Sequence, residues 1–280
     1  MKEKMTATQL KLQAEINRKR LVEIVQKAKA GHIGGGLSAM NMLTALYFRE
    51  MNINPAEPKM ALRDRFVMSK GHCVEALYSV LQNRGFITKE LTDTLGEFDS
   101  VLAGHPTIEV NGIEVNSGAL GHGLPIGVGM AIAAKMDKQP WRTFVLMGDG
   151  EQGEGSIYEA AMAGSHYKLD NLVAIIDRNR LQISDTTENV MALEPIADRW
   201  TAFGWDVKDI NGDSMEAIVE ALDSIDYTNG KPHLIISRTT KGYGVSLMEN
   251  VLKWHHGVPT QEEYEKAIAE IEARIESLKN

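Results

Sequence analysis

Cysteine is almost absent from this 280-residue chain, and no run of apolar residues is long enough to cross a membrane. The single cysteine, Cys73, excludes an intrachain disulfide and suits a reducing compartment. Basic residues are outnumbered, with 30 Lys and Arg against 38 Asp and Glu and a formal net charge of −8. We therefore expect no general nucleic-acid surface and no membrane-binding surface. The first residues, MKEKMTATQLKLQAEINRKR, are charged and unlike a secretory signal, which predicts a cytoplasmic protein.

The remaining composition is that of a globular protein, with 43% hydrophobic and 24% charged residues. No repeat or linker divides the chain, so we expect a single domain over residues 1–280. Periodicity and breaker residues predict helices at 7–29, 38–51, 124–138, 155–168, 214–224 and 260–278, and a loop entering a helix over 71–85. Apolar runs predict strands at 65–69, 142–149, 171–179, 204–210 and 233–239, and residues 99–119 fit an ordered loop. This alternation predicts an α/β fold, with an open, mostly parallel sheet covered by helices on both faces.

One glycine-rich run, MGDGEQGEG at residues 147–155, follows a predicted strand. Asp149 lies at the carboxyl end of that strand, and Asn179 lies at the carboxyl end of the next. Both ends meet at the same edge of a parallel sheet, which is the edge where such sheets bind ligands. Two oxygen-bearing side chains and a backbone carbonyl suit Mg²⁺, and Gly148 and Gly150 would let the backbone approach a phosphate.

Two other interpretations of this run compete with a phosphate site. A calcium-binding loop of the EF-hand type needs a Glu at its twelfth position, but the twelfth residue counted from Asp149 is Ala160. A plain glycine-rich turn between a strand and a helix remains compatible with the local sequence. The rest of the chain must therefore decide between a turn and a phosphate site.

The histidines favour a ligand site. Four of the eight directly follow a glycine, where chance would give fewer than one such pair: His32, His72, His105 and His122. A Gly-His pair at the end of an element leaves the imidazole beside open backbone that a ligand can reach. A single such histidine is more often structural, whereas four of them point to a shared site.

These segments resemble the transketolase family. The pair GDGEQGEG and DRNRLQISD is similar to the thiamine diphosphate signature of that family. Five further segments resemble transketolase segments in the same order: AKAGHIGGGLS, RDRFVMSKGHCVEALY, LAGHP, NSGALGHGLPIGVGMA and TTKGYGVSLMENVLKWHHGVP. The resemblance covers residues 10–275 and is to the N-terminal, diphosphate-binding domain. It implies the thiamine diphosphate-binding fold.

The resemblance also implies a cofactor site. It assigns Mg²⁺, or Ca²⁺ or Mn²⁺ in its place, to the side chains of Asp149 and Asn179 and the carbonyl of Leu181. It assigns contacts with thiamine diphosphate to His72, Gly118, Leu120, Gly121, Gly148, Gly150, Glu151, Asn179, Ile183 and His256. Leu120 and Ile183 would pack around the thiazolium ring, although both could equally be core residues.

For catalysis, the resemblance points to His32, His105 and His256, because imidazoles can move protons on and off sugar hydroxyls near neutral pH. Glu154 would take part in communication between paired active sites, and it fits equally well as an acid in the first turn of a helix. Three other histidines, His122, His166 and His233, are expected to be structural, and Cys73 is expected to be a packed thiol. Trp254 and His255 receive no role.

A complete transketolase is more than twice as long as this chain, and we find no second α/β half to bind the aminopyrimidine and supply the activating Glu. We therefore expect one subunit of a split transketolase, which is inactive without a C-terminal partner subunit and forms a heterotetramer with it. The alternatives are the alpha subunit of a 2-oxo acid dehydrogenase, a deoxyxylulose phosphate synthase-like chain, or a noncatalytic cofactor-binding subunit. Departures from the family pattern, such as Ile33 after the first Gly-His pair, leave the sugar open among phosphorylated, branched and sulfonated ketoses.

Overall fold

The computed structural model describes residues 4–279 and has a five-stranded, wholly parallel sheet at its centre. From one edge to the other the strands are β1 (Arg65–Met68), β2 (Thr143–Gly148), β3 (Leu172–Arg178), β7 (His233–Arg238) and β6 (Asp206–Asn211). A separate antiparallel pair joins β4 (Leu181–Gln182) to β5 (Asp185–Thr186). The predicted α/β class with an open, mostly parallel sheet is confirmed.

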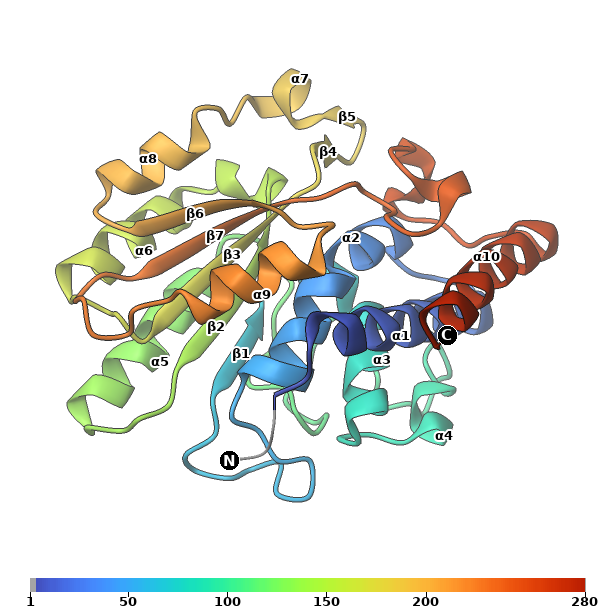
Figure 1. Cartoon of the computed structure of the whole chain (residues 1–280), viewed down its shortest axis with the longest axis horizontal. Coiled ribbons are helices and arrows are strands. Elements are labelled where there is room, and N and C mark those ends of the chain that lie inside the picture. Colours follow the sequence, from blue (N-terminus) through green and yellow to red (C-terminus); the bar gives the residue numbers. More distant parts are fainter. Residues whose placement is uncertain (1–3, 280) are drawn as a thin grey trace.

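Helices cover both faces of this sheet (Figure 1). On one face lie α1 (Ala7–Ala28), α2 (Ile33–Ala45), α3 (Val74–Arg84) and α9 (Met215–Asp223), with α10 (Gln261–Lys279) packed against α1. On the other face lie α5 (Gly123–Met136), α6 (Gly155–His166) and α8 (Ile196–Ala202). The short helices α4 (Lys89–Thr92) and α7 (Thr187–Met191) complete the α-helices within the described residues. None of the helices between residues 4 and 279 is both long and apolar enough to pass through a lipid bilayer.

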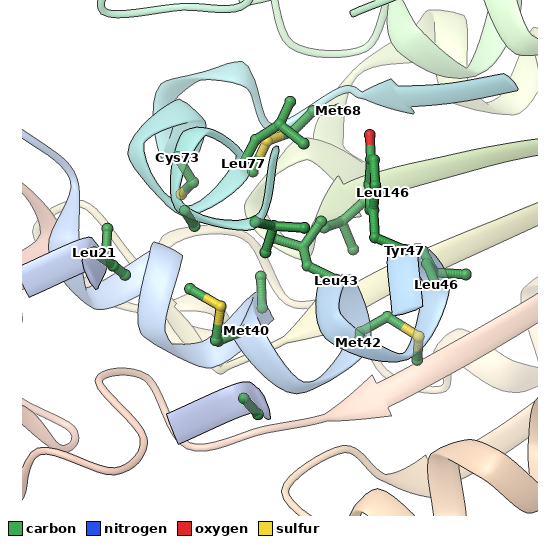
Figure 2. Close-up of a cluster of buried hydrophobic side chains, with 14 of the residues drawn as sticks. Leu21, Met40, Met42, Leu43, Leu46, Tyr47, Met68, Cys73, Leu77 and Leu146 are labelled. Carbon is green, nitrogen blue, oxygen red and sulfur yellow. The ribbon is translucent and has the colours of Figure 1, made fainter. Parts of the chain in front are cut away.

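Alternation along the strands divides the apolar side chains between two cores. Phe144 and Leu146 of β2 face the core beneath α1, α2 and α3, whereas Val145 and Met147 face the core beneath α5 and α6. Figure 2 shows Leu146 meeting side chains from α2 and α3, including Leu43 and Leu77. Because both faces of the strand are covered, its central positions are apolar, which explains the hydrophobic runs of the sequence.

The second helix begins earlier than the sequence predicts. The expected range is 38–51, but the helix starts at Ile33, inside the glycine run, and continues as a π-helical turn over Leu46–Glu50. A Cβ atom on Gly34 would lie 2.6 Å from the carbonyl oxygen of Trp254, and one on Gly35 would lie 2.7 Å from Cys73 Sγ. These glycines therefore allow close packing of the helix instead of ending it. As a result, His32 lies at the N-cap of α2.

Several short elements are absent from the sequence prediction, namely α4, α7, α8 and the β4–β5 pair. Helix α8 anchors the buried Trp200, and the β4–β5 pair closes one side of the sheet edge described below. Residues 99–119 contain no helix or strand, as expected for an ordered loop. Cys73 is a buried free thiol, also as expected.

Candidate functional site

A cavity of about 390 Å³ opens at the carboxyl edge of the parallel sheet. This volume lies within the usual range for small-molecule sites. Its wall contains most of the residues that the sequence singled out: His32, His72, Gly118, Leu120, Gly148, Asp149, Gly150, Glu151, Glu154, Asn179, Leu181 and Ile183. Gly121, His105 and His256 are not in the wall but lie next to residues that are.

Of the three proposed metal ligands, Asp149 follows β2, Asn179 follows β3 and Leu181 begins β4. The carboxylate of Asp149 is buried and accepts from the backbone N–H groups of Gly150 at 2.8 Å and Arg180 at 2.6 Å. Asn179 donates its amide N–H to Asp177 Oδ2 at 3.0 Å, which leaves Oδ1 to accept from Leu181 N at 3.2 Å. Burial and the charge of Asp177 raise the pKa of the Asp149 carboxyl.

This donor set has the chemistry of a hard-cation site rather than of a complete metal cage. Among residues 4–279 no group of three His, Cys, Asp or Glu side chains could hold a metal by itself. One carboxylate, one amide oxygen and one carbonyl suit a cation such as Mg²⁺, which usually keeps water and ligand phosphates in its coordination shell. The residues therefore fit a metal that arrives together with a phosphate.

Two buried lysines make the cavity suitable for an anion, and the sequence reasoning missed both. Lys70 Nζ donates to Asp177 Oδ2 at 2.5 Å and to the Gly35 carbonyl at 3.0 Å. Lys241 Nζ donates to the Leu181 carbonyl at 3.0 Å. Burial alone would lower the pKa of Lys70, but the Asp177 carboxylate raises it, whereas burial and the charge of Lys70 lower the pKa of Lys241. The missed signal is that each lysine follows the carboxyl end of a strand and precedes a glycine.

Four imidazoles cluster beside these lysines, and three of them line the cavity. His32 lies with its ring centroid 5.1 Å from that of His72 and 4.7 Å from that of His256. His255, to which the sequence gave no role, lines the cavity with its ring centroid 5.8 Å from that of His72. A parallel bridge between His32 and Gly257 brings these distant segments together.

Burial sets the charge of these rings. It lowers the pKa of His32 to about 3, helped by the neighbouring His72 and His256. Burial and the charge of Lys70 lower the pKa of His72 to about 4, and burial and Lys241 lower that of His255 to about 3. All three are therefore neutral near pH 7, so each ring offers one donor and one acceptor nitrogen.

His105 approaches from the loop at 99–119. It is exposed, and a Cβ atom on Gly118 would lie only 2.6 Å from its Cδ2 atom. Gly118 has φ +149°, so the glycine both permits this backbone shape and makes room for the ring. Burial and His72 lower the pKa of His105. The ring thus stands at the cavity rim beside a residue of the wall.

The two acids of the glycine-rich run differ in surroundings. Glu151 is buried and accepts from Gly121 N at 2.8 Å, from Gly148 N at 3.0 Å and from the hydroxyl of Ser69. Glu151 therefore connects three segments: the loop after β1, the loop before α5 and the end of β2. Burial raises the pKa of its carboxyl. Glu154 is exposed at the start of α6. A Cβ atom built on Gly121 would lie 2.6 Å from the Cβ atom of Glu154.

The two apolar residues predicted at the site stand at the cavity mouth. Leu120 is half-buried, whereas Ile183 is 66% exposed in the turn between β4 and β5. Ile183 also has φ +51°, a left-handed conformation that is rare for a β-branched residue. Exposure and backbone strain together at a cavity are typical of a residue held in place for a ligand.

The histidines expected to be structural lie away from the wall of the cavity. His233 is buried at the amino end of β7, where its Nδ1 atom lies 3.2 Å from Asp206 Oδ2. His166 is exposed at the end of α6, and His122 is the N-cap of α5, with Nδ1 3.2 Å from the Leu120 carbonyl. No role in the site follows from these positions.

Comparison with known proteins identifies relatives of the whole chain. A family model described as the thiamine diphosphate binding domain of transketolase matches residues 11–273. The chain is 72% identical over 274 residues to one of the subunits of the apulose-4-phosphate transketolase of Phocaeicola vulgatus, covering 98% of each chain. It is 42% identical over 264 residues to the 6-deoxy-6-sulfo-D-fructose transketolase subunit SqwG of Clostridium sp., covering 94% of this chain and 96% of that one.

Solved structures show the same similarity. The transketolase of Campylobacter jejuni superposes with a TM-score of 0.89 at 33% identity over 94% of this chain. The chain corresponds to only 42% of that enzyme's length. More than half of the solved enzyme therefore has no counterpart in these 280 residues.

Proposed function

This chain belongs to the transketolase family as its N-terminal, thiamine diphosphate-binding part, and from that premise we propose that it is one subunit of a two-chain transketolase acting on apulose 4-phosphate. The observation that carries the proposal is the 72% identity, over 98% of both chains, to a relative with that named substrate. In the proposed reaction a two-carbon ketol unit passes from the ketose phosphate to an aldose acceptor. Membership of this family argues against the 2-oxo acid dehydrogenase and deoxyxylulose phosphate synthase alternatives.

The cavity fits the diphosphate end of the cofactor. Thiamine diphosphate, when bound, supplies a thiazolium carbon that can add to a ketose and stabilise the resulting carbanion. Lys70, Lys241 and His72 would hold the diphosphate, with the open backbone at Gly148 beside it. Ile183 would cover the thiazolium ring, which accounts for its exposed and strained position.

The metal would be Mg²⁺, or Ca²⁺ or Mn²⁺ in its place, held by Asp149, Asn179 and the carbonyl of Leu181. Support comes from the hard oxygen donors of these three residues, which lie at the wall of one cavity. The metal and the two lysines would together balance the charge of the diphosphate.

The histidines would handle protons on the sugar. His32 lines the cavity and is in ring contact with His256, and His105 stands at the rim. A neutral imidazole can accept a proton from a sugar hydroxyl or hold that hydroxyl by a hydrogen bond. A noncatalytic cofactor-binding subunit would need none of these three rings, and their grouping at one cavity favours a catalytic one.

A partner subunit would complete the site. The chain spans 42% of a solved transketolase, and its relatives in Phocaeicola vulgatus and Clostridium sp. are themselves named as single subunits of transketolases. We propose that the partner binds the aminopyrimidine and supplies the Glu that activates the cofactor. A heterotetrameric assembly and a cytoplasmic location remain predictions from the sequence.

The test is to co-purify the chain with its native partner and assay both samples with thiamine diphosphate, Mg²⁺ and a panel of ketose donors. We expect ketol transfer from apulose 4-phosphate by the pair and none by the chain alone. Complete ketol transfer by the chain alone, or recovery of only self-associated chain, would contradict the two-chain proposal.

A second substrate is 6-deoxy-6-sulfo-D-fructose, named for the relative that is 42% identical. The same panel distinguishes the two donors, because the partner and the assay conditions do not change. Preference for the sulfonated donor would leave the two-chain proposal intact and replace only its substrate.

A further inference from the structure

The side chain of Lys241 binds an atom that the proposed metal also needs. Its Nζ atom donates to the Leu181 carbonyl at 3.0 Å and lies 3.0 Å from His255 Nδ1. The residue is only 2% exposed, so water does little to solvate the charge. A buried ammonium thus lies on one of the three oxygens expected to bind the metal.

The other cations around the cavity floor are matched by carboxylates, but Lys241 is not. Lys70 pairs with Asp177, and Arg178 lies 3.3 Å from Asp149 Oδ2. Within residues 4–279, Lys241 makes no ion pair, and its hydrogen-bond partners are a carbonyl and an imidazole. Among the described residues of the cavity wall, Lys241 is therefore a cation without a carboxylate partner, and an incoming anion can compensate its charge.

We propose that Lys241 makes metal binding conditional on the diphosphate, by holding the Leu181 carbonyl with a positive charge until an anion draws that charge away. This inference rests on the proposed cofactor site. A divalent metal that shares the carbonyl with the ammonium meets a like charge in a poorly solvated place. A bound diphosphate attracts both cations and removes this conflict. Metal and diphosphate therefore bind cooperatively, and by linkage each raises the affinity for the other equally.

Removing the charge of Lys241 should strengthen binding of the metal alone, because its competitor is gone. The same change should weaken binding of the diphosphate, because an attractive charge is lost. A merely structural lysine would weaken both when replaced, so the opposite signs separate the two roles.

The experiment uses the complex of the chain with its partner and compares Lys241→Met and Lys241→Gln, which are neutral, with Lys241→Arg, which keeps the charge. Lys253→Met is the matched control, since Lys253 is exposed and pairs with Glu263 at the surface. Mn²⁺ affinity is measured by electron paramagnetic resonance of free Mn²⁺, with and without thiamine diphosphate. Cofactor affinity is measured by titration calorimetry at saturating Mn²⁺.

We expect both neutral variants to bind Mn²⁺ alone about threefold to tenfold more tightly, and to bind the cofactor about tenfold more weakly, within the usual range of coupling between two sites. Lys241→Arg and Lys253→Met should match the wild type in Mn²⁺ affinity. If neither neutral variant gains affinity for Mn²⁺ alone while the wild-type complex binds metal and cofactor, the Lys241 inference is wrong and the proposed function stands. If the wild-type complex binds neither ligand, the cofactor site itself is refuted, and this inference with it.

Discussion

Replacing Asp177 with Asn should destabilise the protein by about 3–5 kcal/mol, the usual cost of breaking a buried ion pair on one side. Asp177 and Lys70 are each 1% exposed, and Lys70 Nζ lies 2.5 Å from Asp177 Oδ2. Without the carboxylate, the ammonium keeps only the Gly35 carbonyl at 3.0 Å. The penalty is that of a buried charge left uncompensated.

The neighbours of Asp177 support the upper part of this range. The carboxylate also accepts from the hydroxyls of Ser38 and Thr239, both at 2.6 Å, and from Asn179 Nδ2 at 3.0 Å. An Asn side chain has one acceptor oxygen, so its NH₂ group would face at least one of these donors. Each buried donor left without an acceptor adds roughly 1–3 kcal/mol.

The assay is urea unfolding followed by tryptophan fluorescence, with Lys70→Met and the double variant completing a cycle. The double variant should be markedly less destabilised than the sum of the single ones, because it leaves no unpaired charge. Asp223→Asn is the control, since its pair with Arg49 is partly exposed and should contribute less than about 1 kcal/mol.

The pH dependence provides a second check of sign. The Lys70 ammonium and its hydrogen bonds lower the pKa of Asp177 although burial alone would raise it. A depressed carboxyl pKa means that its stabilisation is present above the unfolded value, about 3.9, and is lost as the pH falls through the lower folded value. The difference between wild type and Asp177→Asn should therefore be constant from pH 6 to 8. A cost below about 1 kcal/mol, with additive single variants, would refute the buried pair as the source of stability.

Three other substitutions test the site and its surroundings. Asp149→Ala should reduce Mg²⁺-dependent affinity for thiamine diphosphate in the assembled complex by at least about tenfold; wild-type affinity in calorimetry would remove Asp149 from the metal site. Glu75→Gln should flatten the pH dependence of stability. Burial raises the pKa of Glu75 to about 8, so the wild type loses stability as the pH rises from about 4.3 towards that value. Urea unfolding at pH 6 and 8 measures the difference, and an equal change in unfolding free energy between these pH values in both proteins would contradict it. Ile183→Asn should stabilise the chain by up to about 1 kcal/mol, since Asn tolerates a positive φ, while weakening cofactor binding; thermal unfolding and calorimetry measure the two effects, and a loss of stability would show that the strain is not relieved.

The positions of Asp149 and Asn179, two of the proposed metal ligands, were predictable because they depend on the sheet alone. Parallel pairing aligns Gly148 of β2 with Asp177 of β3, so the residues after both strands meet at one edge. Long apolar runs identified both strands, and the oxygen-bearing side chains followed directly. The proximity of Asp149 and Asn179 could therefore be predicted from the sequence without knowledge of any other contact.

The cationic and imidazole side chains needed the tertiary structure. His255 reaches the cavity because the segment before Gly257 bridges to His32, more than 200 residues earlier in the chain. Lys241 donates to the Leu181 carbonyl across two segments that are 60 residues apart, and no sequence pattern predicts that they meet. The early start of α2 had the same cause, since a glycine run reads as a break unless the close neighbours of Gly34 and Gly35 are known.

A single buried carboxylate links the two halves of the site that the sequence treated separately. Asp177 accepts from Asn179 Nδ2, while Oδ1 of that amide accepts from Leu181 N, and Asp177 also pairs with Lys70 in the cavity wall. The same residue thus orients the proposed metal ligand Asn179 and the proposed phosphate-binding Lys70 while it stabilises the fold. Stability and cofactor affinity should therefore fall together in Asp177→Asn, whereas in Lys241→Met the change should appear in ligand affinity first, because Lys241 pairs with no carboxylate within residues 4–279.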